Sequence, residues 1–113
     1  MHGRLEPSDK LMRPMKVQVQ VLPWLSGLIG AQIDEEVAFE ISLHQECTLQ
    51  QFLEELDVQR PDVAALIYDQ KHGAVKATAL LMLNNRAFEL AGGYGTLLKD
   101  GDNITLLAAY IGG

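Results

Sequence analysis

The sequence contains one cysteine, few aromatic residues and no cluster of basic residues, and each shortage excludes a class of protein. The single cysteine, Cys47, can neither close an internal disulfide nor supply the four thiolates of a plant-type iron–sulfur cluster. We therefore expect it to act as a small buried hydrophobic residue. Lys and Arg number 9 against 15 Asp and Glu, for a net charge of -6. This balance disfavours nucleic acid and favours a partner with a basic surface.

Long hydrophobic runs and metal-binding spacings are missing as well. No apolar run is long enough to cross a bilayer, and the first residues lack the apolar centre of a signal peptide, so a cytoplasmic protein away from membranes is expected. His2, His44 and His72 do not fall at the spacing of metal ligands, and no cysteine pair accompanies them. They are expected to be surface residues, and no metal site is predicted.

The length of 113 residues suits one domain with one core, and 48% apolar content is ordinary for a globular protein. Residues 1–14 mix charges, Gly and Pro without periodicity, which predicts a flexible leader. The folded domain is expected over residues 15–113.

Two amphipathic strands open this domain. Val17, Val19 and Val21 alternate with polar residues, and residues 37–44 repeat the pattern, which has the period of a half-buried strand. Because the two segments follow one another along the chain, an antiparallel pair is predicted.

A helix follows the second strand. Thr48 with Gln51 three residues later resembles a capping box, in which each residue satisfies a free N–H group of the other. An apolar stripe at helical spacing predicts one buried face. It consists of Leu49, Phe52, Leu53 and Leu56. Glu54 and Glu55 are expected to face water, and a second short helix is predicted over residues 61–68 because Pro61 suits a first turn.

The last third of the chain predicts strands again. The apolar run 79–83 ends at Asn84-Asn85, which can form a tight reversal into a short edge strand because Asn tolerates positive φ. Residues 92–95 (GGYG) are expected to form a mobile loop, since they lack the Lys-Ser/Thr of a phosphate-binding loop. A final strand from Ile104 completes the pattern. The order predicts an α+β fold in which a main helix crosses a mixed sheet of four or five strands.

The final strand runs almost to a Gly-Gly terminus. Gly112 and Gly113 have no side chains, so they make a thin, flexible peptide that can enter a narrow cleft and present its carboxylate there.

With that ending, the sequence resembles the ubiquitin-like sulfur carriers of the MoaD/ThiS family. The resemblance rests on residues 47–53 (CTLQQFL), on the reversal 83–86 (LNNR) and on residues 97–107 (LLKDGDNITLL) followed by the terminal Gly-Gly. The family often has prolines before the last residues of its tail, where this chain has Ala108-Ala109-Tyr110-Ile111. The resemblance implies the β-grasp, or ubiquitin-like, fold.

The resemblance also implies a carrier rather than an enzyme. In such a carrier an E1-like enzyme uses ATP to adenylate the carboxylate of Gly113, and a sulfur donor then converts the adenylate to a thiocarboxylate. The tail residues Gly112, Ile111 and Tyr110 would be held in the partner's groove, and the carrier itself binds no cofactor. The size of the chain favours the small subunit of molybdopterin synthase, whose sulfur is passed to the large subunit for molybdenum or tungsten cofactor synthesis.

Three other functions stay open from the sequence. The carrier could serve thiamin or cysteine synthesis, or the chain could be a ubiquitin-like modifier that is joined to target proteins through Gly113. It could also be a β-grasp interaction domain in which the terminal glycines have no role.

Overall fold

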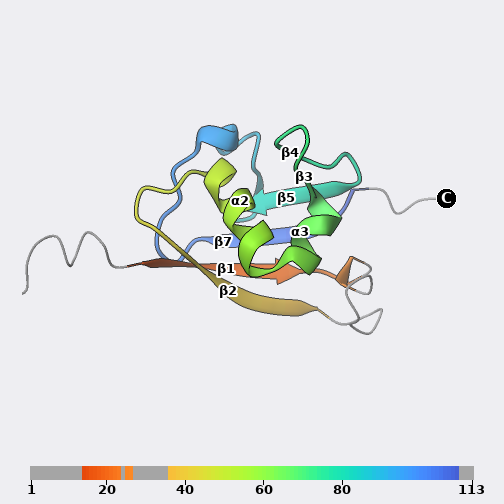
Figure 1. Cartoon of the computed structure of the whole chain (residues 1–113), viewed down its shortest axis with the longest axis horizontal. Helices are drawn as coiled ribbons and strands as arrows, with labels where there is room; N and C mark the ends of the chain where they lie inside the picture. Colours follow the sequence, from red (N-terminus) through yellow and green to blue (C-terminus); the bar gives the residue numbers. More distant parts are fainter. Residues whose placement is uncertain (1–13, 24, 27–35, 110–113) are drawn as a thin grey trace, which may run out of the picture.

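The computed structural model describes residues 14–23, 25–26 and 36–109, and Figure 1 shows two helices lying across one side of a sheet. The elements in chain order are β1 (Met15–Val21), β2 (Val37–Leu43), α2 (Leu49–Gln59), α3 (Pro61–Ile67), β3 (Tyr68–Asp69), β4 (Ala74–Val75), β5 (Ala79–Leu83), β6 (Arg86–Ala87), the 3₁₀ helix η2 (Gly93–Gly95) and β7 (Asn103–Ala108).

The main sheet has 5 strands in the order β2-β1-β7-β5-β6. β1 and β2 form the antiparallel pair expected from the sequence, with Met15 opposite Leu43 and Val21 opposite Val37. The last strand, β7, lies parallel to β1 and antiparallel to β5, so it occupies the middle of the sheet. The sheet is therefore mixed, and the predicted α+β architecture is confirmed.

Helix α2 begins at the predicted capping box. The Thr48 hydroxyl accepts from the Gln51 backbone N–H at 3.2 Å, and the Gln51 side chain accepts from the Thr48 N–H at 2.8 Å. The predicted apolar stripe of this helix is buried in full. Helix α3 follows after Arg60 with Pro61 in its first turn, as predicted.

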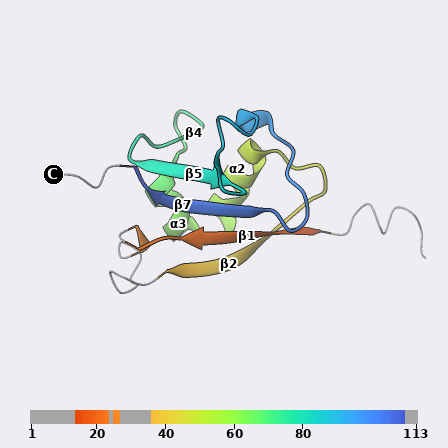
Figure 2. The same cartoon turned by 180° about the vertical axis from the view of Figure 1, so that it is seen from behind.

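The core lies between the helices and one face of the sheet. Phe52 of α2, Val19 of β1 and Leu106 of β7 are all 0% exposed and belong to the same cluster. Cys47 is 7% exposed and joins that cluster, which confirms its predicted burial. Figure 2 shows the sheet in front of the helices, so no described helix covers its second face.

The turns between strands follow the local sequence. Asn84 and Asn85 both have positive φ, at 52° and 70°, which confirms the predicted reversal into β6. The Asn84 amide also donates to Asp102 at 3.1 Å and its carbonyl oxygen accepts from the Asn103 N–H at 2.9 Å, so the side chain joins two turns.

Two features differ from expectation. The segment predicted as a mobile loop contains η2, where the Tyr94 ring packs 4.8 Å from that of Phe88 and its hydroxyl accepts from the Val75 N–H at 2.9 Å. Ahead of it, Gly92 has φ +125°, and a Cβ there would lie 2.3 Å from the Thr96 hydroxyl. The small β3–β4 hairpin was not predicted, because its strands of 2 residues each are too short to show a period.

Residues 1–13, most of the predicted leader, lie outside the described residues, so the boundary at residue 15 stays a prediction. Within the part of the chain that the structure describes, no helix is long and apolar enough to cross a membrane.

Candidate functional site: the tail exit and the uncovered sheet face

The predicted tail residues Tyr110, Ile111, Gly112 and Gly113 lie outside the described residues. The structure does place the point from which they leave the domain. That point is Ala109, directly after β7, and the residues around it form the candidate site.

Hydrogen bonds hold the end of β7 on both sides. The Ala109 N–H donates to the Thr78 carbonyl at 2.9 Å, just before β5 begins. On the other side, the Leu22 N–H donates to the Leu106 carbonyl at 2.9 Å, which continues the parallel pairing with β1. The tail therefore leaves from a strand whose position is set by two neighbours.

The uncovered face of the sheet carries apolar side chains next to this exit. Leu107 lies opposite Leu80 of β5, and Met82 lies on the same face two residues further along. Leu80 is 45% exposed, while Met82 and Leu107 are half-buried. Leu22 continues the alternation of β1 and reaches the same face. We call these four residues the tail-side patch.

The other half of the uncovered face is polar. Gln18 of β1 donates to Glu40 of β2 at 2.6 Å, and Gln20 of β1 donates to Glu36, directly before β2, at 2.6 Å. An apolar centre next to a polar rim is the usual composition of a specific protein interface. The apolar half is the one next to Ala109, the last described residue.

This patch was not identified from the sequence. Leu107 comes from the last strand, whereas Leu80 and Met82 come from β5 and Leu22 follows β1. The run 79–83 is apolar throughout and therefore does not show which of its side chains are exposed. Only the pairing of Leu80 with Leu107 shows that a patch forms.

Of the two acidic residues of α2 that were expected to face water, one differs from expectation. Glu54 is exposed as predicted, but Glu55 is half-buried and accepts from the Gln59 side chain at 2.8 Å. Asp57 is half-buried and accepts from Gln70. These carboxylates are held by neighbouring amides rather than simply solvated.

The described histidines are exposed. The ring of His72 contacts the Asp69 carboxylate at 2.7 Å, and this contact keeps the pKa of Asp69 below its usual range. His44 lies in the connection between β2 and α2, and His2 is outside the described residues. No group of three or more His, Cys, Asp or Glu side chains among the described residues could hold a metal ion.

No protein-family model and no curated protein sequence matches the chain, but many solved structures do. Small archaeal modifier protein 1 from Methanosarcina acetivorans is 22% identical with a TM-score of 0.64, over 88% of this chain and 98% of that one. The chain has the β-grasp fold.

Two further β-grasp structures are similar over nearly their whole length. Urm1 from Trypanosoma brucei is 22% identical with a TM-score of 0.61, covering 88% of this chain and 97% of that one. A protein from Pyrococcus furiosus assigned as subunit 1 of a molybdopterin converting factor is 20% identical with a TM-score of 0.58, covering 85% and 99%. The β-grasp fold implied by the sequence resemblance is thus confirmed, and these structures belong to the group of proteins that the resemblance named.

Proposed function

We propose that the chain is a ubiquitin-like sulfur carrier whose terminal Gly113 is adenylated and then converted to a thiocarboxylate. The observation that carries this proposal is the position of the tail exit. A central strand, held on both sides, ends beside the tail-side patch and continues in the sequence to Gly-Gly. A partner that docks on the patch would receive the tail in a defined place.

The chemistry needs little from the domain itself. A carboxylate is a poor electrophile because its two oxygens share the charge, and adenylation by an E1-like enzyme supplies a leaving group. ATP gives up pyrophosphate in that step, and sulfide then displaces AMP from the carbonyl carbon to leave the thiocarboxylate. Gly112 and Gly113 serve this chemistry by being narrow, and Tyr110 and Ile111 would fill the entrance of the partner's groove.

Sulfur delivery to a molybdopterin synthase large subunit is the acceptor reaction we favour. The similarity to the Pyrococcus furiosus protein and the resemblance in sequence both support it. Transfer to thiamin or cysteine synthesis would use the same carrier and a different acceptor.

A protein modifier is the second candidate, and the similarity to small archaeal modifier protein 1 favours it. It would pass through the same adenylate, after which a target lysine rather than sulfide attacks the carbonyl carbon. Isopeptide-linked adducts in cell extract would support the modifier, and a stable complex with a synthase subunit would support the carrier.

The deciding experiment is the intact mass of the untagged protein after incubation with ATP, a candidate activating enzyme and a sulfide source. We expect a gain equal to the exchange of one oxygen for sulfur, mapped to Gly113. A chain lacking Gly113 is the matched control and should stay unchanged. The carrier function would be contradicted if the wild-type chain stayed unmodified with several homologous activating enzymes, each shown to be active on another carrier.

A further inference from the structure

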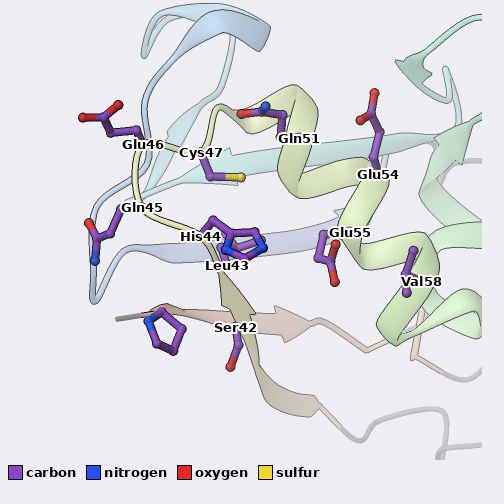
Figure 3. Close-up of a pocket in the computed structure, with 11 residues that line it drawn as sticks. Ser42, Leu43, His44, Gln45, Glu46, Cys47, Gln51, Glu54, Glu55 and Val58 are labelled. Atoms are coloured by element: carbon purple, nitrogen blue, oxygen red, sulfur yellow. The ribbon is translucent and has the colours of Figure 1, made fainter. Parts of the chain in front are cut away.

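A groove lies between the end of β2 and helix α2, at the opposite end of β1 from the tail exit (Figures 1 and 3). Its volume is about 440 Å³. Figure 3 shows Glu55 and Val58 projecting from α2, with Cys47 and His44 on the connection that precedes the helix. We call this hollow the β2–α2 groove.

The groove has an apolar lining. Leu43 and Cys47 are buried at 3% and 7% exposure, and both line it. Val58 is 73% exposed on the rim. Because Val58 follows Glu54 by four positions and Glu55 by three, the three side chains lie together on the helix surface. The apolar side chain of Val58 and the two carboxylates therefore lie side by side on α2.

The groove is also negatively charged. Glu46, Glu54 and Glu55 line it, and its lining contains neither Lys nor Arg. The pKa of the Cys47 thiol is raised, first by burial and then by the charges of Glu55 and Glu54. The negative charges of Glu54 and Glu55 therefore reach the Cys47 thiol inside the groove.

One of these carboxylates is held in position. The Gln59 side-chain amide donates to Glu55 at 2.8 Å and to the Ser42 backbone carbonyl at 2.9 Å. This amide ties the last turn of α2 to the edge of β2, and it fixes Glu55 between them. A carboxylate that is already positioned loses less entropy when a cation binds to it.

We propose that the β2–α2 groove binds a segment of a partner protein in which a lysine or arginine stands next to an apolar side chain. The cation would pair with Glu55 and Glu54, and the apolar side chain would pack against Val58 and the buried lining. Charge complementarity selects this occupant, because a net-acidic lining repels nucleic acid and acidic peptides. The groove lies away from the tail-side patch, so this inference does not depend on the proposed function.

The probe is a blocked tetrapeptide with two lysines flanking two leucines, titrated into the full-length protein and followed by amide NMR shifts. We expect the shifts to cluster on residues 42–47 and 54–58. The same peptide with glutamates in place of lysines should not bind. As a second readout, the lysine peptide should slow the alkylation of Cys47, since it covers the entrance to the thiol.

Substitutions separate the two parts of the groove. Glu55→Gln should weaken binding of the lysine peptide by about fivefold to tenfold, because a charged partner is lost. Val58→Ser should weaken it as well, while leaving the preference for lysine over glutamate in place. Glu89→Gln is the matched control, since it removes one exposed carboxylate outside the groove and should leave the affinity unchanged.

Four results would overturn the proposal: equal binding of the two peptides, no binding of either, shifts outside the groove, or wild-type affinity in Glu55→Gln. A fifth result would show that the chain's own N-terminal segment occupies the groove. Pro14 lines the groove, and Lys10 and Arg13 precede Pro14 in the sequence. If replacing both Lys10 and Arg13 by Gln shifts the groove's resonances without peptide, the chain fills its own groove and no partner segment is needed.

Discussion

The two ends of strand β1 are built in different ways. At the Val21 end, the tail exit is held by strands that are distant in sequence, since β7 pairs there with β1 and β5. At the Met15 end, the β2–α2 groove is formed by the consecutive segment from Ser42 to Gln59, together with Pro14. β1 has 7 residues, so the two regions lie roughly 20 Å apart along it.

The two ends also differ in charge. The tail-side patch is apolar, whereas the groove carries three carboxylates. Each end therefore suits a different kind of partner surface, and one domain of this size can engage both without overlap. Strand pairing between β1, β5 and β7 thus sets where the tail leaves, while the contact of Gln59 with Ser42, which are 17 positions apart, joins the two sides of the groove.

The largest effect is expected in the middle of the sheet. Leu106→Ala should lower the free energy of unfolding by about 3 kcal/mol, because Leu106 is 0% exposed and its loss leaves a cavity. Leu107→Ala, one residue along on the half-buried face, should cost only about 1 kcal/mol. Urea denaturation of both variants measures the difference. Equal losses would mean that the uncovered face is packed as tightly as the core.

A change on the tail-side patch should affect activation more than stability. Leu80→Ser is expected to lower kcat/KM for adenylation by about tenfold, because an exposed apolar contact with the activating enzyme is lost. Ser42→Ala, at the other end of the molecule, is the control and should leave adenylation unchanged. An unaltered rate in Leu80→Ser would place the docking surface elsewhere.

A smaller effect is expected at the start of α2, where the cap partner Gln51 lines the groove. Thr48→Ala removes the hydroxyl that caps α2 and should cost about 1 kcal/mol of unfolding free energy, measured by thermal denaturation. Thr48→Ser keeps the cap and should restore most of the loss. Since the cap is local, the rate of adenylation at the far end should be the same in the wild type, Thr48→Ala and Thr48→Ser. A changed rate would show that the two regions are energetically coupled.

The smallest effect concerns the titration of Cys47. Burial raises the pKa of this thiol above its ordinary value, and the charges of Glu55 and Glu54 raise it further, so Glu55→Gln should move the pKa down. Because the folded-state pKa is the higher one, the neutral thiol stabilises the fold below the unfolded pKa, and this contribution disappears as pH rises through the folded pKa. The pH dependence of alkylation measures the pKa. A thiol whose pKa is the same in Glu55→Gln as in the wild type would contradict the contribution attributed to Glu55.

Local sequence predicted most of the elements correctly. The capping box of Thr48 and Gln51, the reversal at Asn84 and the burial of Cys47 were all found as expected. Each depends on a few neighbouring residues or on hydrophobicity alone. The hairpin of β3 and β4 and the 3₁₀ helix η2 were not found, because their few residues carry no period and are held by contacts such as that of Tyr94 with Val75.

The candidate site was predicted only in part. Gly112 and Gly113 could be singled out from the sequence, and they remain outside the described residues. The tail-side patch needed the pairing of β5 with β7, which joins residues more than twenty positions apart. The β2–α2 groove needed the contact of Gln59 with Ser42. Neither contact can be recognised from a local sequence pattern.

By itself, the sequence determined the longer strands and helices and, where apolar and polar residues alternate, which side chains are buried, since period, capping and turn chemistry act within a few residues. It also supplied the Gly-Gly terminus. Only the tertiary structure decided that the last strand lies at the centre of the sheet, that its end emerges beside an apolar patch, and that an acidic groove forms at the other end. These features depend on contacts between distant segments, which form only when the whole core is assembled.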